Sequence, residues 1–366
     1  MTEHVAELEL IRLTKRFAQV IAVDRVSLRL GRGEFLSLLG PSGCGKTTTL
    51  RMIAGFVHPD EGRIVYRGRD ITEDPPYRRD AGLVFQNYAL FPHMSVGDNV
   101  AFGLRMRRAA KHVIRERAAW ALDLVRLSGY EHRRPHELSG GQQQRVAVAR
   151  VLATGASLLL FDEPFSNLDA KLRKEMQGEL RELQQQLGIA VVHVTHDQEE
   201  AMSMSDRLII MNEGRVVQEG GPGDVYRTPG SEFVAEFMGQ CNRLTAHVIE
   251  PHHDPAHARL ALESGGQLQL ARSELGHARG RVSVLIRPEH IEIALAGAIR
   301  GRANVLAGVV RRVVYRGSTT TLHINLDEST EVLVEVSNPS DGPLAYTPGT
   351  QVDLSVPISA IRVFSD

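Results

Sequence analysis

The chain has 366 residues, of which 42% are hydrophobic and 24% charged, and its formal net charge is −1. This length predicts two domains, and the composition excludes a disordered or fibrous protein. The near-zero charge excludes attraction of the whole protein to nucleic acid or to an anionic membrane, so we expect no nucleic-acid partner.

The first residues and the cysteines indicate where the chain works. No apolar run reaches the length of a membrane span, and residues 1–10 carry three glutamates where a secretory signal needs an apolar core. Two cysteines, Cys44 and Cys241, cannot form a disulfide framework. We therefore expect a protein that stays in the cytoplasm.

Short apolar runs alternate with helical patterns over the first two thirds of the chain, which predicts a mostly parallel α/β sheet. Buried strands are expected at 34–39, 157–161 and 189–194. A helix that ends at Gly188 is predicted between the last two strands, because one set of apolar side chains recurs at helical spacing. This set is Leu172, Met176, Leu180, Leu183 and Leu187.

Two stretches resemble binding sites, one for nucleic acid or lipid and one for metal, but we expect neither to bind these ligands. Residues 100–130 are helical in pattern and rich in arginine, and we expect a solvated helix face rather than a grip on nucleic acid or lipid. Residues 251–257 contain three histidines, but their spacing fits no standard metal site, so a solvated linker is expected.

After residue 238 the pattern changes to short β-like segments separated by Gly, Pro and polar turns, which predicts a small all-β sandwich or barrel. A hairpin turn is expected at 316–318. The predicted strands are 282–286, 305–314, 319–324, 332–336 and 352–356.

A phosphate-binding loop is predicted between the first buried strand and a helical pattern. The segment fits G-x-x-x-x-G-K-[ST], in which glycines let backbone N–H groups turn toward a phosphate. Lys46 is expected to reach the β and γ oxygens, the Thr47 hydroxyl to ligate Mg²⁺, and Thr48 to add a phosphate contact. The residues expected to contact the nucleotide are Gly40, Pro41, Ser42, Gly43, Cys44, Gly45, Lys46, Thr47 and Thr48.

Two adjacent carboxylates end the strand at 157–161. At the C-terminal end of a strand, Asp162 is placed to hold the Mg²⁺ shell and Glu163 to polarise an attacking water. Adjacent carboxylates alone often mark only the solvated end of a strand, but here they share a chain with a phosphate-binding loop.

Residues 138–145 (LSGGQQQR) resemble the signature motif of the ABC (ATP-binding-cassette) ATPases. A serine followed by two glycines at a helix start offers a hydroxyl and N–H groups to an anion. The alternative is a plain helix cap with a flexible turn. The residues expected to contact a nucleotide here are Ser139, Gly140, Gly141 and Gln142.

The resemblance covers residues 8–238 and implies roles for four further residues. It implies that Gln86 touches Mg²⁺ or the water, that His196 contacts the γ-phosphate, and that Asp169 crosses to the site of the other subunit. Phe17 occupies the position of an aromatic ring that stacks on adenine, with a core role as the alternative. Catalysis is thus expected from Glu163, His196, Gln86 and Lys46, and metal binding from Thr47, Gln86 and Asp162.

The resemblance also implies a fold: an α/β P-loop NTPase, here an ABC cassette over residues 1–238, with a helical subdomain at about 88–155. A small all-β domain of the TOBE/OB-like type is expected over 239–366. Residues 286–289 (IRPE) and 314–317 (VYRG) resemble that domain in the sugar, polyamine and iron importer ATPases.

This resemblance implies that the chain hydrolyses ATP with Mg²⁺ in a head-to-tail pair with a second copy of itself. The resemblance also implies that the chain works peripherally on the cytoplasmic face of the inner membrane. There we expect it to bind a transmembrane permease and to be served indirectly by an extracytoplasmic solute-binding protein. Residues 88–99 resemble the segment that receives the permease. The substrate is left open among polyamine, iron, phosphonate and sugar, and residues 90–95 favour the first three.

Two other classes of protein compete with this interpretation. A non-transport ABC ATPase of the translation or DNA-repair type would carry a second cassette or a long coiled coil, which the sequence lacks. A P-loop kinase or GTPase would leave residues 138–145 unexplained.

Overall fold

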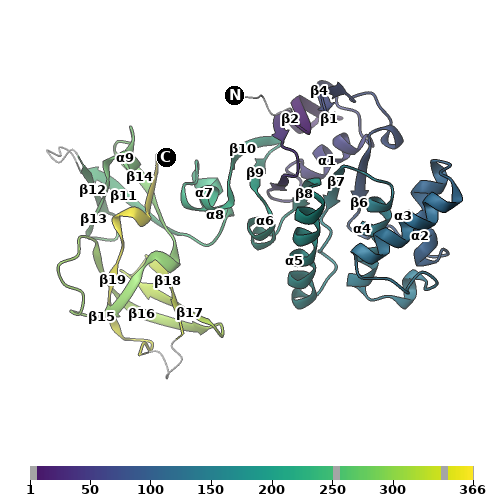
Figure 1. Cartoon of the computed structure of the whole chain (residues 1–366). Coiled ribbons are helices and arrows are strands. Elements are labelled where there is room, and N and C mark those ends of the chain that lie inside the picture. Colours follow the sequence, from purple (N-terminus) through teal and green to yellow (C-terminus); the bar gives the residue numbers. More distant parts are fainter. Residues whose placement is uncertain (1–5, 250–255, 339–344, 366) are drawn as a thin grey trace. The chain divides into compact units, whose positions relative to one another are not determined.

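The computed structural model describes residues 6–249, 256–338 and 345–365, and the chain forms two compact units, Met1–Gly230 and Ser231–Asp366 (Figure 1). The predicted domain boundary lies slightly later, between residues 238 and 239. Helix α8 (Glu232–Phe237) therefore belongs to the second unit. The predicted linker at 251–257 lies mostly outside the described residues, and His257 already begins a strand.

The first unit is built on a six-stranded sheet with the order β10-β9-β3-β8-β7-β6, in which only β10 is antiparallel to its neighbour. All residues of β3, β7 and β8 are buried, as expected for parallel strands covered on both faces. The three predicted central strands are confirmed to within a residue or two. The strands are β3 Phe35–Leu39, β6 Ala81–Val84, β7 Leu158–Asp162, β8 Ala190–Thr195, β9 Arg207–Asn212 and β10 Arg215–Gly220.

A second, antiparallel sheet of the same unit has the order β2-β1-β4-β5 and was not predicted. Its apolar residues pack with helix α1 (Lys46–Ala54) and with residues of the central sheet in one hydrophobic core. The strands are β1 Leu8–Phe17, β2 Val20–Leu30, β4 Glu61–Tyr66 and β5 Arg69–Asp70.

Three helices form the part predicted as a helical subdomain: α2 (Val96–Met106), α3 (Lys111–Leu124) and α4 (Gly140–Ala153). Their apolar faces share a core with residues of α5 and the central sheet. The basic side chains of α2 and α3 are mostly exposed, and Arg105 pairs with Asp98 at 2.6 Å. The predicted solvated helix face is confirmed.

Helix α5 (Ala170–Leu187) ends as predicted, because Gly188 adopts a left-handed φ of 61° and its N–H bonds to the Gln184 carbonyl. Met176 and Leu180 of the predicted apolar face are buried. Two short helices complete the unit: α6 (Gln198–Met204) and α7 (Pro222–Arg227).

The second unit consists of two five-stranded antiparallel sheets that enclose one core, with the orders β13-β12-β11-β14-β20 and β15-β19-β16-β17-β18. The five predicted strands are present, and the hairpin at 316–318 joins β16 to β17 with Gly317 at φ 89°. The strands are β11 Asn242–Ile249, β12 His257–Leu262, β13 Gln267–Ala271, β14 Arg281–Ile286, β15 Glu292–Leu295, β16 Val305–Tyr315, β17 Thr319–Asn325, β18 Glu331–Ser337, β19 Gln351–Ser355 and β20 Ile361–Ser365, with helix α9 at Arg272–Leu275.

Candidate nucleotide site

Four loops that carry predicted site residues begin at the same edge of the central sheet. Strands β3, β8, β7 and β6 are neighbours and run parallel, and the last residue of each strand pairs within one residue of the end of its neighbour. The carboxyl ends of parallel strands share one edge, where α/β proteins bind ligands. The loops that begin there contain Gly40–Thr47, His196, Glu163 and Gln86.

Two glycines of the loop after β3, Gly40 and Gly45, are required by the space around them. A Cβ at Gly40 would lie 2.2 Å from the Met211 carbonyl oxygen, and one at Gly45 would lie 2.4 Å from the Ala22 carbonyl oxygen. Gly45 also has a φ of 104° as the N-terminal cap of α1. The backbone is thus packed too closely for side chains, and the helix start offers free N–H groups to an anion.

Lys46 is buried, and its ammonium group donates hydrogen bonds to the carbonyl oxygens of Gly40 at 2.7 Å and Pro41 at 2.9 Å. Within the described part of the chain no carboxylate forms an ion pair with it. A buried cation held by neutral groups, here two carbonyls and the Cys44 sulfur, attracts an anionic ligand such as phosphate.

Thr47 and Asp162 bring two hard oxygen atoms together, because the Thr47 hydroxyl donates to Oδ1 of Asp162 at 3.1 Å. Burial raises the pKa of the Asp162 carboxyl, against the opposing effects of the Thr47 hydrogen bond and Arg51. A divalent cation would relieve the cost of this buried charge, and Mg²⁺ prefers carboxylate and hydroxyl oxygens. The two residues therefore fit the predicted metal.

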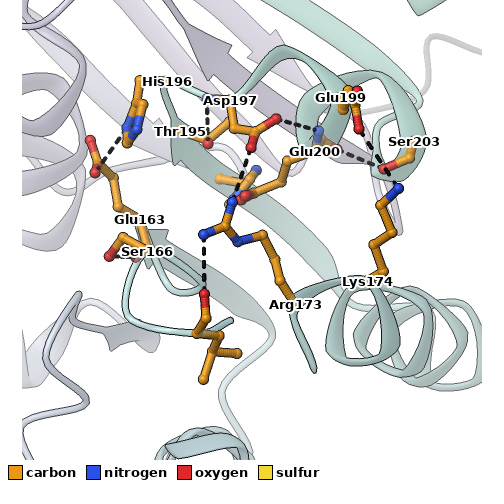
Figure 2. A network of polar contacts seen from close by, with 12 residues as sticks. Glu163, Ser166, Arg173, Lys174, Thr195, His196, Asp197, Glu199, Glu200 and Ser203 are labelled. Carbon is orange, nitrogen blue, oxygen red and sulfur yellow. Dashed lines mark hydrogen bonds and ion pairs between the residues drawn. The ribbon is translucent and has the colours of Figure 1, made fainter. Parts of the chain in front are cut away.

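Glu163 and His196 come from neighbouring strands and face each other, as Figure 2 shows. His196 Nδ1 lies 3.1 Å from Oε2 of Glu163, and both side chains retain contact with solvent. Glu163 has a φ of 48°, a strained conformation for a residue with a side chain, and its N–H bonds to the Val194 carbonyl. The strand end thus holds a carboxylate where a water molecule can reach it.

An arginine that sequence reasoning missed joins two of the loops. Arg173 Nη1 donates to Asp197 at 3.4 Å, and Nη2 donates to the Leu168 carbonyl at 3.1 Å (Figure 2). Asp197 also caps α6 by accepting from the Glu200 N–H. The segment around Asp169 is therefore tied to Asp197, the residue next to His196. Of the two residues in this link, only Asp197 could have been found from the sequence, because an aspartate at a helix start is a capping signal.

The serine-glycine motif at the start of α4 forms a capping box. The Ser139 hydroxyl accepts from the Gln142 N–H, and the Gln142 side chain accepts from the Ser139 N–H. A Cβ on Gly140 or Gly141 would press on Leu168 or Leu172 at about 3.2 Å and 3.1 Å. Within the described residues, the motif makes no hydrogen bond to the phosphate-binding loop of its own chain.

The remaining predicted residues lie apart from these contacts. Phe17 is 48% exposed, so the alternative of a core role is wrong, and Lys15 lies 5.5 Å from its ring. Gln86 is exposed, and its carbonyl accepts from Asn167 at 3.0 Å. Asp169 caps helix α5. Their contacts with nucleotide stay predictions.

Comparison with known proteins follows the division of the chain. Residues 23–166 match the "ABC transporter" family and residues 284–364 match the "TOBE domain" family. A spermidine/putrescine import ATP-binding protein PotA of Nitratidesulfovibrio vulgaris is 45% identical over 97% of this chain and 96% of its own length. The protein of the same name from Acidothermus cellulolyticus is 46% identical over 93% of this chain and 88% of its own.

Solved structures of ABC cassettes resemble the chain at 31–33% identity. CbiO1 of Clostridium perfringens, part of the ABC transporter complex cbiONQ, matches with a TM-score of 0.56 over 60% of this chain and 90% of that protein. The dimeric cassette MJ0796 bound to ADP and phosphate matches with a TM-score of 0.52 over 59% and 98%. The predicted fold class, a P-loop cassette followed by a small all-β domain, is confirmed.

We predict that Gly40→Ala raises the dissociation constant for ATP about tenfold or more, because the new methyl group cannot coexist with the Met211 carbonyl. Calorimetric titration with ATP measures the change. Gly178→Ala on α5 is the matched control, since nothing lies near its Cβ, and it keeps wild-type affinity. Equal affinities in all three proteins would contradict the packing argument.

We predict that Asp162→Asn raises the melting temperature of the nucleotide-free protein at neutral pH, because the wild type buries an ionised carboxyl whose pKa is raised. Because the pKa of Asp162 is raised in the folded state, this carboxyl is protonated at a higher pH in the folded wild type than in the unfolded chain. The advantage of the variant is therefore complete above the raised pKa and fades as the pH falls toward 3.8. Melting curves from pH 3.5 to 8 test this, and a lower melting temperature for the variant at pH 8 would refute it.

We predict slow alkylation of Cys44 that still accelerates above about pH 9, because burial raises the pKa of the thiol and only the thiolate reacts. A Cys241→Ser background isolates the signal. ATP is expected to protect the thiol, and complete labelling to block hydrolysis, since Sγ lies 3.8 Å from Lys46 Nζ. Full activity after complete labelling would disprove the placement of Cys44 against the nucleotide.

Proposed function

The chain belongs to the ABC transporter family, as an ATP-hydrolysing importer subunit with a C-terminal TOBE domain, and from this premise we propose how its residues work and what it helps to import. The observation that carries the proposal is the shared sheet edge, which gathers Lys46, Asp162, Glu163 and His196.

Nucleotide binding rests on the loop after β3. Lys46 leaves the Gly40 and Pro41 carbonyls for the β and γ oxygens of ATP, and the N–H groups at the start of α1 bind the phosphates. Thr47, Asp162 and Gln86 would hold Mg²⁺, which neutralises charge on the phosphates when it is bound. Phe17 offers an exposed ring for the adenine.

Hydrolysis rests on Glu163. Its carboxylate polarises the attacking water, and His196, 3.1 Å away, fixes its direction. The strained backbone at Glu163 aims the side chain away from the buried strand, and the hydrogen bond from the Glu163 N–H to Val194 holds that aim. Lys46 and His196 are placed to stabilise the negative charge that develops on the transferred phosphoryl group.

A complete site requires a second copy of the chain. The signature residues Ser139 to Gln142 pack against Leu168 and Leu172 of their own chain and have no bond to its phosphate-binding loop among the described residues. We propose a head-to-tail pair in which each signature closes over the ATP of the other copy. Asp169 and its neighbours then face the opposite site, and Arg173 links the adjacent Leu168 carbonyl to Asp197, the residue that follows His196.

The membrane is reached through a partner. No helix of the described residues is long and apolar enough to cross a bilayer. We propose that the chain attaches to the cytoplasmic face of the inner membrane by binding a permease, with residues 88–99 as the receiving segment. A solute-binding protein outside the cytoplasm delivers the cargo to that permease.

A polyamine is the proposed cargo. The two relatives described above align with nearly the whole chain, C-terminal domain included, and both are named for spermidine and putrescine import. Likeness over both domains supports a shared transport system more strongly than likeness of the cassette alone, since every ABC protein has a cassette.

We predict that Glu163→Gln keeps ATP affinity, lowers the hydrolysis rate at least about 100-fold and accumulates as an ATP-bound dimer, because the amide cannot accept a proton from water. Phosphate release and size-exclusion chromatography with ATP measure both effects. Glu199→Gln, which changes an exposed carboxylate nearby on α6, is the control and stays at wild-type rate. Wild-type turnover by Glu163→Gln would remove Glu163 from the mechanism.

Deleting the gene is predicted to abolish uptake of labelled spermidine at low external concentration. Wild-type protein restores the uptake and Glu163→Gln does not, because transport needs hydrolysis. Unchanged polyamine uptake, together with a lost uptake of iron, phosphonate or sugar, would contradict the proposed cargo and retain the importer.

A further inference from the structure

The turn that follows Gln86 has an unusual backbone. Tyr88 and Ala89 have φ values of 60° and 46°, although neither is a glycine. Tyr88 is buried, and its N–H bonds to the Phe85 carbonyl across the turn. Residues with side chains keep a left-handed conformation only where their surroundings hold them in it.

Arg150 supplies that hold from helix α4. Its Nη1 donates to the Ala89 carbonyl at 2.7 Å and its Nη2 to the Tyr88 carbonyl at 2.9 Å. The planar guanidinium is suited to two neighbouring acceptors at once. No carboxylate pairs with Arg150 in the described part of the chain, so its charge is directed at these two carbonyls and at the Phe91 ring, 5.8 Å away.

The other end of the same segment is held by Asn99 on α2. This residue is fully buried; its Oδ1 accepts from the Phe91 N–H at 2.8 Å, and its Nδ2 donates to the carbonyls of Phe91 and Ser95. Pro92 and His93, between the two anchors, are exposed. Residues 88–95 thus form a partly exposed segment that is fixed at both ends by side chains of the helical subdomain.

Helix α4 connects this segment to the signature motif. Ser139 caps its first turn and Arg150 lies in its last turn, so one continuous helix joins them. An α-helix rises about 1.5 Å per residue, and helix α4 is unbroken from Gly140 to Ala153. A displacement of the signature toward the nucleotide of a second copy therefore carries Arg150 and the Tyr88 and Ala89 carbonyls with it.

We propose that Arg150 is a positioning residue that couples the signature helix to residues 88–95 and to Gln86, two residues before Tyr88. The inference rests on the proposed function, in which Gln86 serves the nucleotide site and residues 88–99 receive the permease. Asn167, which donates to the Gln86 carbonyl at 3.0 Å, fixes Gln86 from the other side. Through Arg150, the conformation of residues 88–95 therefore depends on the position of the signature motif.

Hydrogen exchange of the full chain with and without ATP and Mg²⁺ tests the coupling, in a Glu163→Gln background that keeps ATP bound. In that parent we expect ATP to slow exchange at least about threefold in peptides covering both 139–145 and 85–95. When Arg150→Gln is added to this parent, ATP is expected still to slow exchange in peptides covering 139–145 but no longer in those covering 85–95. Arg150→Lys is expected to keep part of the slowing in 85–95. Arg117→Gln is the matched control, because Arg117 also binds backbone carbonyls of α4, at Leu152 and Ala153, yet makes no contact with 88–95.

Steady-state kinetics with Glu163 intact provide a second readout. Arg150→Gln is expected to lower kcat at least about fivefold while the KM for ATP stays within about twofold, since the phosphate-binding loop is untouched. Arg117→Gln leaves both within about twofold. A loosened subdomain would instead give the same losses in both variants.

Three outcomes decide between the claims. If ATP still slows exchange in 85–95 after Arg150→Gln, the inference is overturned while the proposed function stands. Equal losses in Arg150→Gln and Arg117→Gln overturn it as well, because they assign the effect to general loosening of the helices. If ATP does not slow exchange of peptides covering 139–145 in the Glu163→Gln parent, the proposed two-copy function is contradicted. The inference is then overturned as well, because it rests on that function.

Discussion

The parallel pairing of β3, β8, β7 and β6 is the constraint on which the nucleotide site depends. All residues of β3, β7 and β8 are buried, so none of these strands can present a functional group along its length. Chemistry is possible only where the strands end, and their parallel direction brings those ends to one edge. Residues separated by more than a hundred positions in the chain meet there, as the bond from Thr47 to Asp162 shows.

The same edge holds charges that the nucleotide-free fold compensates poorly. Lys46 is buried against neutral carbonyls, and burial raises the pKa of Asp162. Each group costs folding free energy alone, and under the proposed function each would be satisfied by one component of Mg²⁺-ATP. The strained backbone at Glu163 adds to the cost, and the partly exposed carboxylate of this residue contacts His196. The proposed binding of Mg²⁺-ATP would therefore stabilise the fold at the positions where the nucleotide-free protein is destabilised.

Sequence reasoning located the central strands, α5 and the motif residues because their signals are local: continuous apolar runs, helical spacing and contiguous motifs. It missed the antiparallel sheet of the first unit, where register shifts beside Arg12, at φ 50°, interrupt the alternation of β1. It also missed Arg173 and Arg150, whose partners include backbone carbonyls distant in sequence or on another element. A side chain that binds a carbonyl leaves no pattern in the sequence, because every residue has a carbonyl.

The central claim is that ATP is hydrolysed between two copies of the chain. The most direct test measures specific ATPase activity across a dilution series while sedimentation gives the fraction of dimer at each concentration. The account predicts that activity follows the dimer fraction and disappears with it. Full activity in a solution that sediments as monomer would contradict the account, because one chain would then complete its own site.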